Sequence, residues 1–154
     1  MGRGNGGYTT KQQRYVDSGQ KEVHDDSAIF VAERYIEMGY ESVFRQVHEN
    51  QKTYDLSIKT SDDTSFVKNI EVKRINSENP TKIARNIKKG FEQLRNEGVV
   101  ALHAFKYNSN DKNGLQLVGQ GIKEAQRKGY VKDKIEVWFK DKKCLTMEEV
   151  LKNV

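Results

Sequence analysis

Three residues, Asp55, Glu71 and Lys73, have types and spacing that could support chemistry on a phosphodiester. Asp55 lies in a short alternating segment, and Glu71 and Lys73 lie two positions apart in a second one. Residues two apart in a strand point to the same face, so Glu71 and Lys73 should project together. Asp55 can lie opposite them if the strands form a hairpin. Two carboxylates can hold a divalent metal ion, and a lysine can orient the water molecule that attacks.

Other residue types offer no competing metal site. Cys144 is the only cysteine, and the histidines are scattered without ligand spacing: His24, His48 and His103. A metal would therefore be held by oxygen atoms, which suits Mg²⁺ first and Mn²⁺ second rather than Zn²⁺. We expect Asp55 and Glu71 as the ligands. The alternative is a solvent-facing Glu-x-Lys pair, because three-residue matches often arise by chance.

The composition is that of a polar, basic chain that can fold. Six Phe, seven Tyr and one Trp argue against wholesale disorder, and 154 residues suit one domain. The net charge of +5 is compatible with a polyanionic partner. We expect a flexible Gly-rich lead-in over 1–19, either a linker with Met1 added or a native tail, and a single domain over 20–154. No apolar run approaches a membrane span or a signal peptide.

The elements that must position these residues alternate in type along the chain. Helices and strands are expected, in order, at Gln20–Met38 (helix), Ser42–Val47, Tyr54–Lys59 and Phe66–Ile75 (strands), a helix capped by Thr81 and running to Asn96, Val99–Phe105 (strand), Gln116–Lys128 (helix), Lys134–Lys140 (strand) and Thr146–Asn153 (short helix). This order predicts an α/β sandwich with a mixed sheet, an antiparallel meander followed by crossovers. Trp138 and Tyr107 are expected in the core, and His103 is expected to be structural.

The helix after Pro80 has a basic and amide edge. At 100° per residue, one sector about a third of the circumference wide contains Lys82, Arg85, Asn86, Lys89 and Gln93, beside an apolar stripe. The basic residues Lys82, Arg85 and Lys89 could bind a phosphate backbone. An amide, either Gln93 or Asn86, could form a hydrogen bond near a metal-bound water. An ordinary solvated helix face is the alternative.

With these motifs the chain resembles the PD-(D/E)xK nuclease superfamily over about residues 20–107. Tyr54-Asp55-Leu56 corresponds to the first acidic motif, and Ile70-Glu71-Val72-Lys73 to the second. The Lys82–Gln93 helix corresponds to the trailing helix, and the helix ending at Gly39 to the leading one. The resemblance implies a restriction-endonuclease-like three-layer α/β sandwich with a central mixed sheet, and Asp55, Glu71 and Lys73 as catalytic residues. One departure is that no Pro precedes Asp55.

The leading helix of that superfamily often contributes another acid. Asp26 fits the usual distance from the closing Gly39, Glu33 lies one heptad nearer, and Glu22 lies one turn earlier. A rise of 1.5 Å per residue separates Asp26 from Glu33 by roughly 10 Å, so one of them at most should reach the metal. Asp26 is slightly favoured over Glu33. Both could instead serve helix solubility and the helix dipole.

The small size, Gly-rich entry and helix, hairpin, basic-helix order resemble C-terminal toxin nuclease domains of bacterial contact-dependent growth inhibition and polymorphic toxin systems. The resemblance implies a monomeric toxin that passes from a secreted or cell-surface effector into the target-cell cytoplasm. There it would cleave tRNA first and DNA second, and a cognate immunity protein would bind it as a heterodimer. The alternatives are a DNA endonuclease of the same fold, either a toxin DNase or a dimeric resolvase-like enzyme, and a noncatalytic basic RNA-binding module.

Overall fold

A six-stranded mixed sheet with four helices forms the fold in a computed structural model, which describes residues 26–44, 55–60 and 68–154. The elements are α1 (Asp26–Glu37), β1 (Tyr40–Phe44), β2 (Leu56–Thr60), β3 (Lys68–Arg74), α2 (Pro80–Gln93), β4 (Val99–Ala104), α3 (Lys112–Arg127), β5 (Lys134–Phe139), β6 (Cys144–Thr146) and α4 (Met147–Leu151). The strands lie in chain order across the sheet. The pairs β1–β2, β2–β3 and β5–β6 are antiparallel, and β3–β4 and β4–β5 are parallel.

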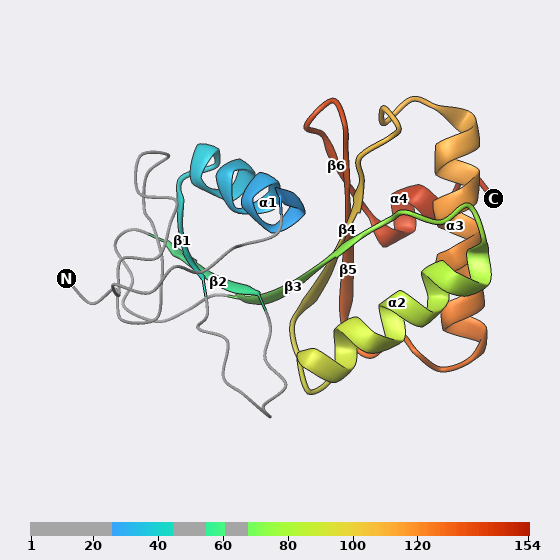
Figure 1. The fold of residues 1–154 in the computed structure, drawn as a ribbon, viewed down its shortest axis with the longest axis horizontal. Helices are drawn as coiled ribbons and strands as arrows, with labels where there is room; N and C mark the ends of the chain where they lie inside the picture. Colours follow the sequence, from blue (N-terminus) through green and yellow to red (C-terminus); the bar gives the residue numbers. More distant parts are fainter. Residues whose placement is uncertain (1–25, 45–54, 61–67) are drawn as a thin grey trace.

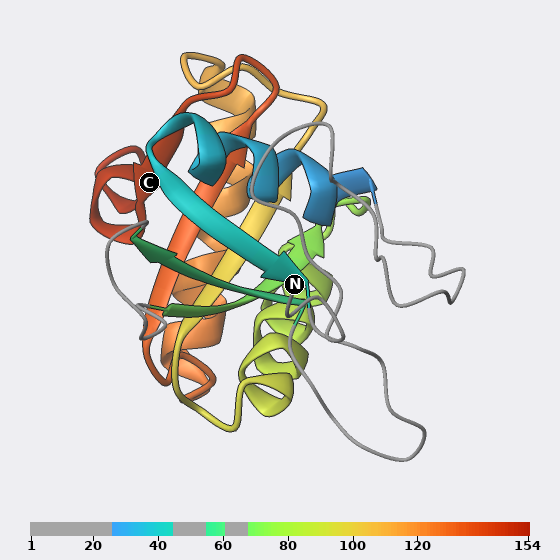
Figure 2. The same cartoon turned by 90° about the vertical axis from the view of Figure 1, so that its left-hand side faces the viewer.

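Helices cover both faces of this sheet (Figure 1). On one face, α1 packs Ala28, Val31 and Tyr35 onto β2, β3 and the start of β4. The other face is covered by α2, α3 and α4, and Val100 and Leu102 of β4 lie in that second core. Figure 2 views the molecule from the α1 side, with α1 and β1 in front of β4 and β5. The expected α/β class with a central mixed sheet and an antiparallel meander is confirmed.

Several boundaries in the first half of the chain differ from the expected ones. β1 begins at Tyr40, two residues before the expected start, because Gly39 ends α1 at a φ of 98° and the strand follows at once. β2 begins at Leu56, so Asp55 immediately precedes the strand. β3 ends at Arg74. The remaining parts of these predictions, at 20–25, 45–54 and 61–67, lie outside the described residues.

The N-cap of α2 is Asn79, and the expectation of Thr81 was wrong. The side chain of Asn79 accepts a hydrogen bond from the Thr81 amide at 2.9 Å, and Pro80 occupies the first helical turn, where its missing N–H costs nothing. The helix ends at Gln93 instead of Asn96. Arg95 and Asn96 have φ of 55° and 67°, which is incompatible with a right-handed helix.

Two further corrections concern the second half. α3 begins at Lys112, because Asp111 accepts from the amides of Asn113 and Gly114 and so caps a helix where a loop was expected. A side chain at Gly114 would come within 2.5 Å of the Tyr107 ring, so glycine serves close packing there. The short edge strand β6 was missed. Its last residue, Thr146, then caps α4 through a capping box.

The expected core residues behave as predicted where the structure describes them. Trp138 is 3% exposed, and Tyr107 is partly buried against the second core. His103 is buried, and its Nδ1 lies 2.7 Å from the Ser27 hydroxyl oxygen. Within the described ranges, every helix is too short or too polar to cross a membrane.

Candidate active site

Asp55 lies across from Glu71 at the end of the β2–β3 ladder. Leu56 pairs with Ile70 in antiparallel register, so the next position sets Asp55 opposite Glu71. The Asp55 amide donates to the Ile70 carbonyl at 3.1 Å, and Asp55 Oδ2 accepts from the Val72 amide at 2.8 Å. The backbone of β3 therefore holds both the main chain and the carboxylate of Asp55.

Glu71 and Lys73 project toward α2. They pair with Val100 and Leu102 of β4, which belong to the core beneath α2 and α3, whereas Val72 belongs to the core beneath α1. The alternation of the strand thus sends the two polar side chains to the same face.

Glu71 is a buried carboxylate beside another carboxylate. The residue is 5% exposed, and its Oε2 lies 3.2 Å from Lys73 Nζ. Its Oε1 is buried without a hydrogen-bond partner in the described residues. Burial and the charge of Asp55 raise the pKa of Glu71 to about 8, although Lys73 acts in the opposite direction. A cation between the two carboxylates would relieve both causes of the raised pKa.

The chemistry of the donor set fits a hard divalent cation. Asp55 and Glu71 supply oxygen atoms only, and Mg²⁺ is commonly held by one or two carboxylates, waters and substrate phosphates. In the described part of the chain, no group of three or more His, Cys, Asp or Glu residues could hold a metal. The pair would therefore need water and a phosphate oxygen to complete the coordination.

Neither candidate helix acid joins this pair. Asp26 and Glu33 belong to α1, which covers the opposite face of the sheet from Glu71. Asp26 is exposed. The Glu33 side chain is 16% exposed, its Oε2 is buried, and its Oε1 lies 3.9 Å from Arg34 Nη2. The third alternative, Glu22, lies outside the described residues.

The orientation of α2 sets its amide and basic edge beside Glu71 and Lys73. Gly90 faces Val100 of the sheet, and Lys88 lies over the Tyr130 ring, 5.5 Å from its centroid, at the end of α3. Residues two apart on a helix point about 200° apart, so Asn86 faces away from α3 and toward the β2–β3 half of the sheet.

The orientation of α2 determines where the predicted substrate-binding residues lie. Lys82 and Lys89 share the Asn86 edge and are exposed, and Arg85 is exposed on the outer face of α2. Gln93 lies on the same edge as Asn86 and is half-buried. Its Oε1 is buried and has no hydrogen-bond partner among the described residues. The structure therefore brings two amides and two lysines to the side of α2 that borders the carboxylate pair.

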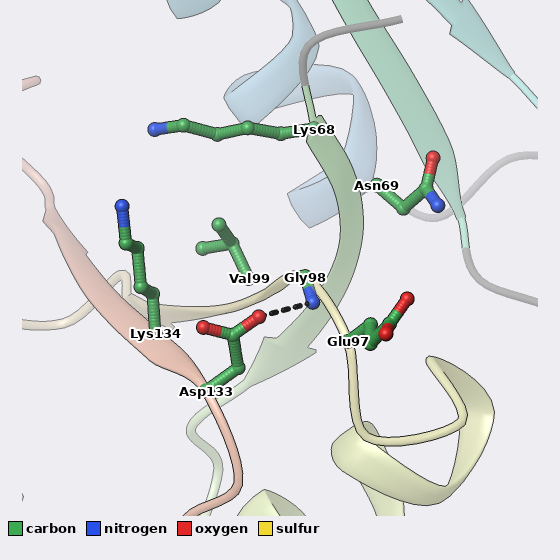
Figure 3. Close-up of a pocket in the computed structure, with 7 residues that line it drawn as sticks. All are labelled: Lys68, Asn69, Glu97, Gly98, Val99, Asp133 and Lys134. Atoms are coloured by element: carbon green, nitrogen blue, oxygen red, sulfur yellow. Dashed lines mark hydrogen bonds between the residues drawn. The ribbon is translucent and has the colours of Figure 1, made fainter.

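A separate cavity of about 540 Å³ lies at the amino-terminal ends of the parallel strands β3, β4 and β5 (Figure 3). It is lined by the first residues of β3, β4 and β5, which are Lys68, Val99 and Lys134, and by residues of mixed charge around them. Asp133 closes one wall by accepting from the Gly98 amide at 2.8 Å. Asp55, Glu71 and Lys73 do not line this cavity.

Two further residues, Arg74 and Phe105, were not predicted as functional residues from the sequence. The Arg74 guanidinium lies 3.9 Å from the centroid of the Phe105 ring, on the α1 face of the sheet. The sequence alone could have indicated Arg74. It lies on the same face of β3 as the buried Ile70 and Val72, where an apolar residue would be expected.

Comparison of the chain with protein-family models, with curated proteins and with solved structures finds no match. The resemblance to PD-(D/E)xK nucleases therefore rests on the short sequence motifs alone.

Proposed function

We propose that this chain is a metal-dependent nuclease with a restriction-endonuclease-like sandwich, and that its preferred substrate is tRNA. The observation that carries the proposal is the juxtaposition of Asp55 with the buried Glu71, with Lys73 Nζ 3.2 Å from the Glu71 carboxylate. A buried carboxylate next to a second carboxylate, with an oxygen that has no hydrogen-bond partner among the described residues, is unfavourable in a purely structural role. Such a pair is typical of a site that binds a metal ion.

Each residue has a role that its position supports. Asp55, oriented by the Val72 amide, and Glu71 would hold Mg²⁺ or Mn²⁺. When bound, the ion would polarise a phosphoryl oxygen and lower the pKa of the attacking water. Lys73 would orient that water or stabilise the charge that develops on the phosphorane.

The order of elements also supports the proposed fold. The elements run in the order α1, the antiparallel strands β1 to β3, the basic helix α2, and then β4, which is parallel to β3. The resemblance to the PD-(D/E)xK superfamily implies this arrangement. Lys82, Arg85 and Lys89 on α2 would bind the substrate backbone. The further likeness to toxin domains makes delivery into a target-cell cytoplasm and a cognate immunity protein part of the same proposal.

The direct test is incubation of the purified chain with total tRNA and with plasmid DNA, each with Mg²⁺ and with EDTA. We expect Mg²⁺-dependent cleavage of tRNA. Glu71→Gln should lower the rate on the order of a thousandfold, because it removes a metal ligand. Glu92→Gln, which changes an exposed glutamate of α2, is the matched control and should cleave normally.

Other outcomes would favour the alternatives. Cleavage of DNA alone would favour a DNA endonuclease, and light scattering would then separate a monomer from a resolvase-like dimer. Salt-sensitive RNA binding without cleavage in Mg²⁺ or Mn²⁺ would favour a noncatalytic module. Full activity of Glu71→Gln would contradict the assigned site.

A further inference from the structure

A row of neighbouring cationic and aromatic side chains lies on the α1 face, where β3 and β4 end. The Arg34 guanidinium lies 4.7 Å from the Phe30 ring centroid, and the Phe30 ring stacks on His103 at 4.3 Å. His103 lies 6.0 Å from Phe105, and the guanidinium of Arg74 lies 3.9 Å from the Phe105 centroid. The last pair differs from the rest of the row, because both of its members are only partly buried.

The Arg74 guanidinium lacks a polar partner in the described part of the chain. Its Nε is buried without a hydrogen bond, and no described carboxylate forms an ion pair with it. A buried N–H without an acceptor is unfavourable, so the position suits an incoming oxyanion. The contact with the Phe105 ring restrains the guanidinium, and a restrained guanidinium can donate two parallel hydrogen bonds to a phosphate.

Arg74 directly follows Lys73 in β3 but points to the other face of the sheet. Lys73 pairs with Leu102 of the α2 core, whereas Arg74 pairs with His103 on the α1 face. β3 therefore carries Glu71 and Lys73 on one face and, at its end, a guanidinium without a polar partner in the described residues on the other. Lys106, exposed and 5.7 Å from the Phe105 centroid, adds positive charge beside Arg74.

We propose that Arg74, positioned over the Phe105 ring, binds a backbone phosphate of the nucleic-acid substrate outside the scissile one. The substrate strand would then pass over the end of β3, from the α2 face to the α1 face. This proposal rests on the proposed nuclease function for the identity of the ligand. A binding measurement that requires no cleavage tests it separately.

The test is fluorescence anisotropy of labelled tRNA with the chain in EDTA over a series of salt concentrations. Arg74→Ala should weaken binding about tenfold at low salt and lower the slope of log K against log salt by about one. Arg74→Lys and Phe105→Leu should have smaller effects in the same direction, because each keeps part of the cation–aromatic arrangement. The control is Lys123→Ala on the exposed side of α3.

Thermal unfolding of each variant accompanies the binding series, and Arg74→Lys keeps the test decisive if Arg74→Ala does not fold. Unchanged tRNA binding by the folded Arg74 variants would overturn the proposal. The proposal would also be overturned if millimolar inorganic phosphate stabilised the parent protein while the Arg74 substitutions left tRNA binding unchanged. The site would then hold free phosphate. Weakened binding in a chain that never cleaves would support the phosphate site and contradict the nuclease function.

Discussion

The backbone amide of Val72 donates to Asp55 Oδ2 at 2.8 Å, so a residue in the middle of β3 orients the carboxylate that precedes β2. The same amide belongs to the residue between Glu71 and Lys73. Main-chain geometry therefore links all three candidate catalytic side chains, and a shift in the β2–β3 register would separate Asp55 from Glu71 and Lys73.

Replacement of Asp55 should distinguish the structural role of this hydrogen bond from the role of the charge. Asp55→Ala leaves the Val72 amide without its acceptor and should lower the free energy of unfolding by about 1.5 kcal/mol. Asp55→Asn retains an acceptor oxygen and should lower it less. The measurement is urea unfolding in EDTA near pH 5, where Glu71 is protonated and its repulsion from Asp55 is absent. Both variants should lose cleavage at pH 8, and equal stability of the two would contradict the assigned hydrogen bond.

Glu71 should make the metal-free protein less stable as the pH rises. Burial and Asp55 raise its pKa to about 8 in the folded state, so the folded chain retains a proton that the unfolded chain loses above about pH 4.5. The contribution to stability is complete below that pH and is lost by about pH 8. Urea unfolding in EDTA across this range should show a decline, on the order of a few kcal/mol, that Glu71→Gln lacks. Parallel pH profiles of the two proteins would refute the assignment.

Magnesium should stabilise the protein more at pH 8 than at pH 5. Binding requires the ionised form of Glu71, and the raised pKa makes the proton a competitor of the metal. The Tm measured with Mg²⁺ or Mn²⁺ should therefore exceed the Tm in EDTA, with the larger difference at the higher pH. Glu71→Gln should abolish the difference, and Glu92→Gln should preserve it. A metal-induced shift that Glu71→Gln retains would locate the ion elsewhere.

The basic residues of α2 should contribute to substrate binding mainly through charge. Lys82, Arg85 and Lys89 are exposed, and each one changed to Gln should lower the slope of log K against log salt for tRNA by about one. Lys123→Gln on α3 provides a comparison with the same loss of charge. If all four substitutions have the same effect, net charge and not the α2 surface governs binding.

Local periodicity in the sequence was sufficient for the class of fold and for half of the site. The alternation in β3 determines that Glu71 and Lys73 share a face, and the apolar stripe of α2 determines which of its side chains remain exposed. Both of these features depend only on residues that are close together in the sequence. Element boundaries were less predictable, because the caps at Asn79 and Asp111 depend on which side chain folds back onto the backbone.

Tertiary structure alone decided which distant residues meet. The antiparallel register sets Asp55 opposite Glu71, whereas the packing of α1 onto the other face keeps Asp26 and Glu33 away from that pair. The contact of Arg74 with Phe105 likewise requires β3 and β4 to lie side by side. The residues themselves limit the chemistry to oxygen ligands and a lysine. Whether these residues meet depends on which strands pair and in which register. No local sequence period records that pairing, because the paired segments are separated along the chain.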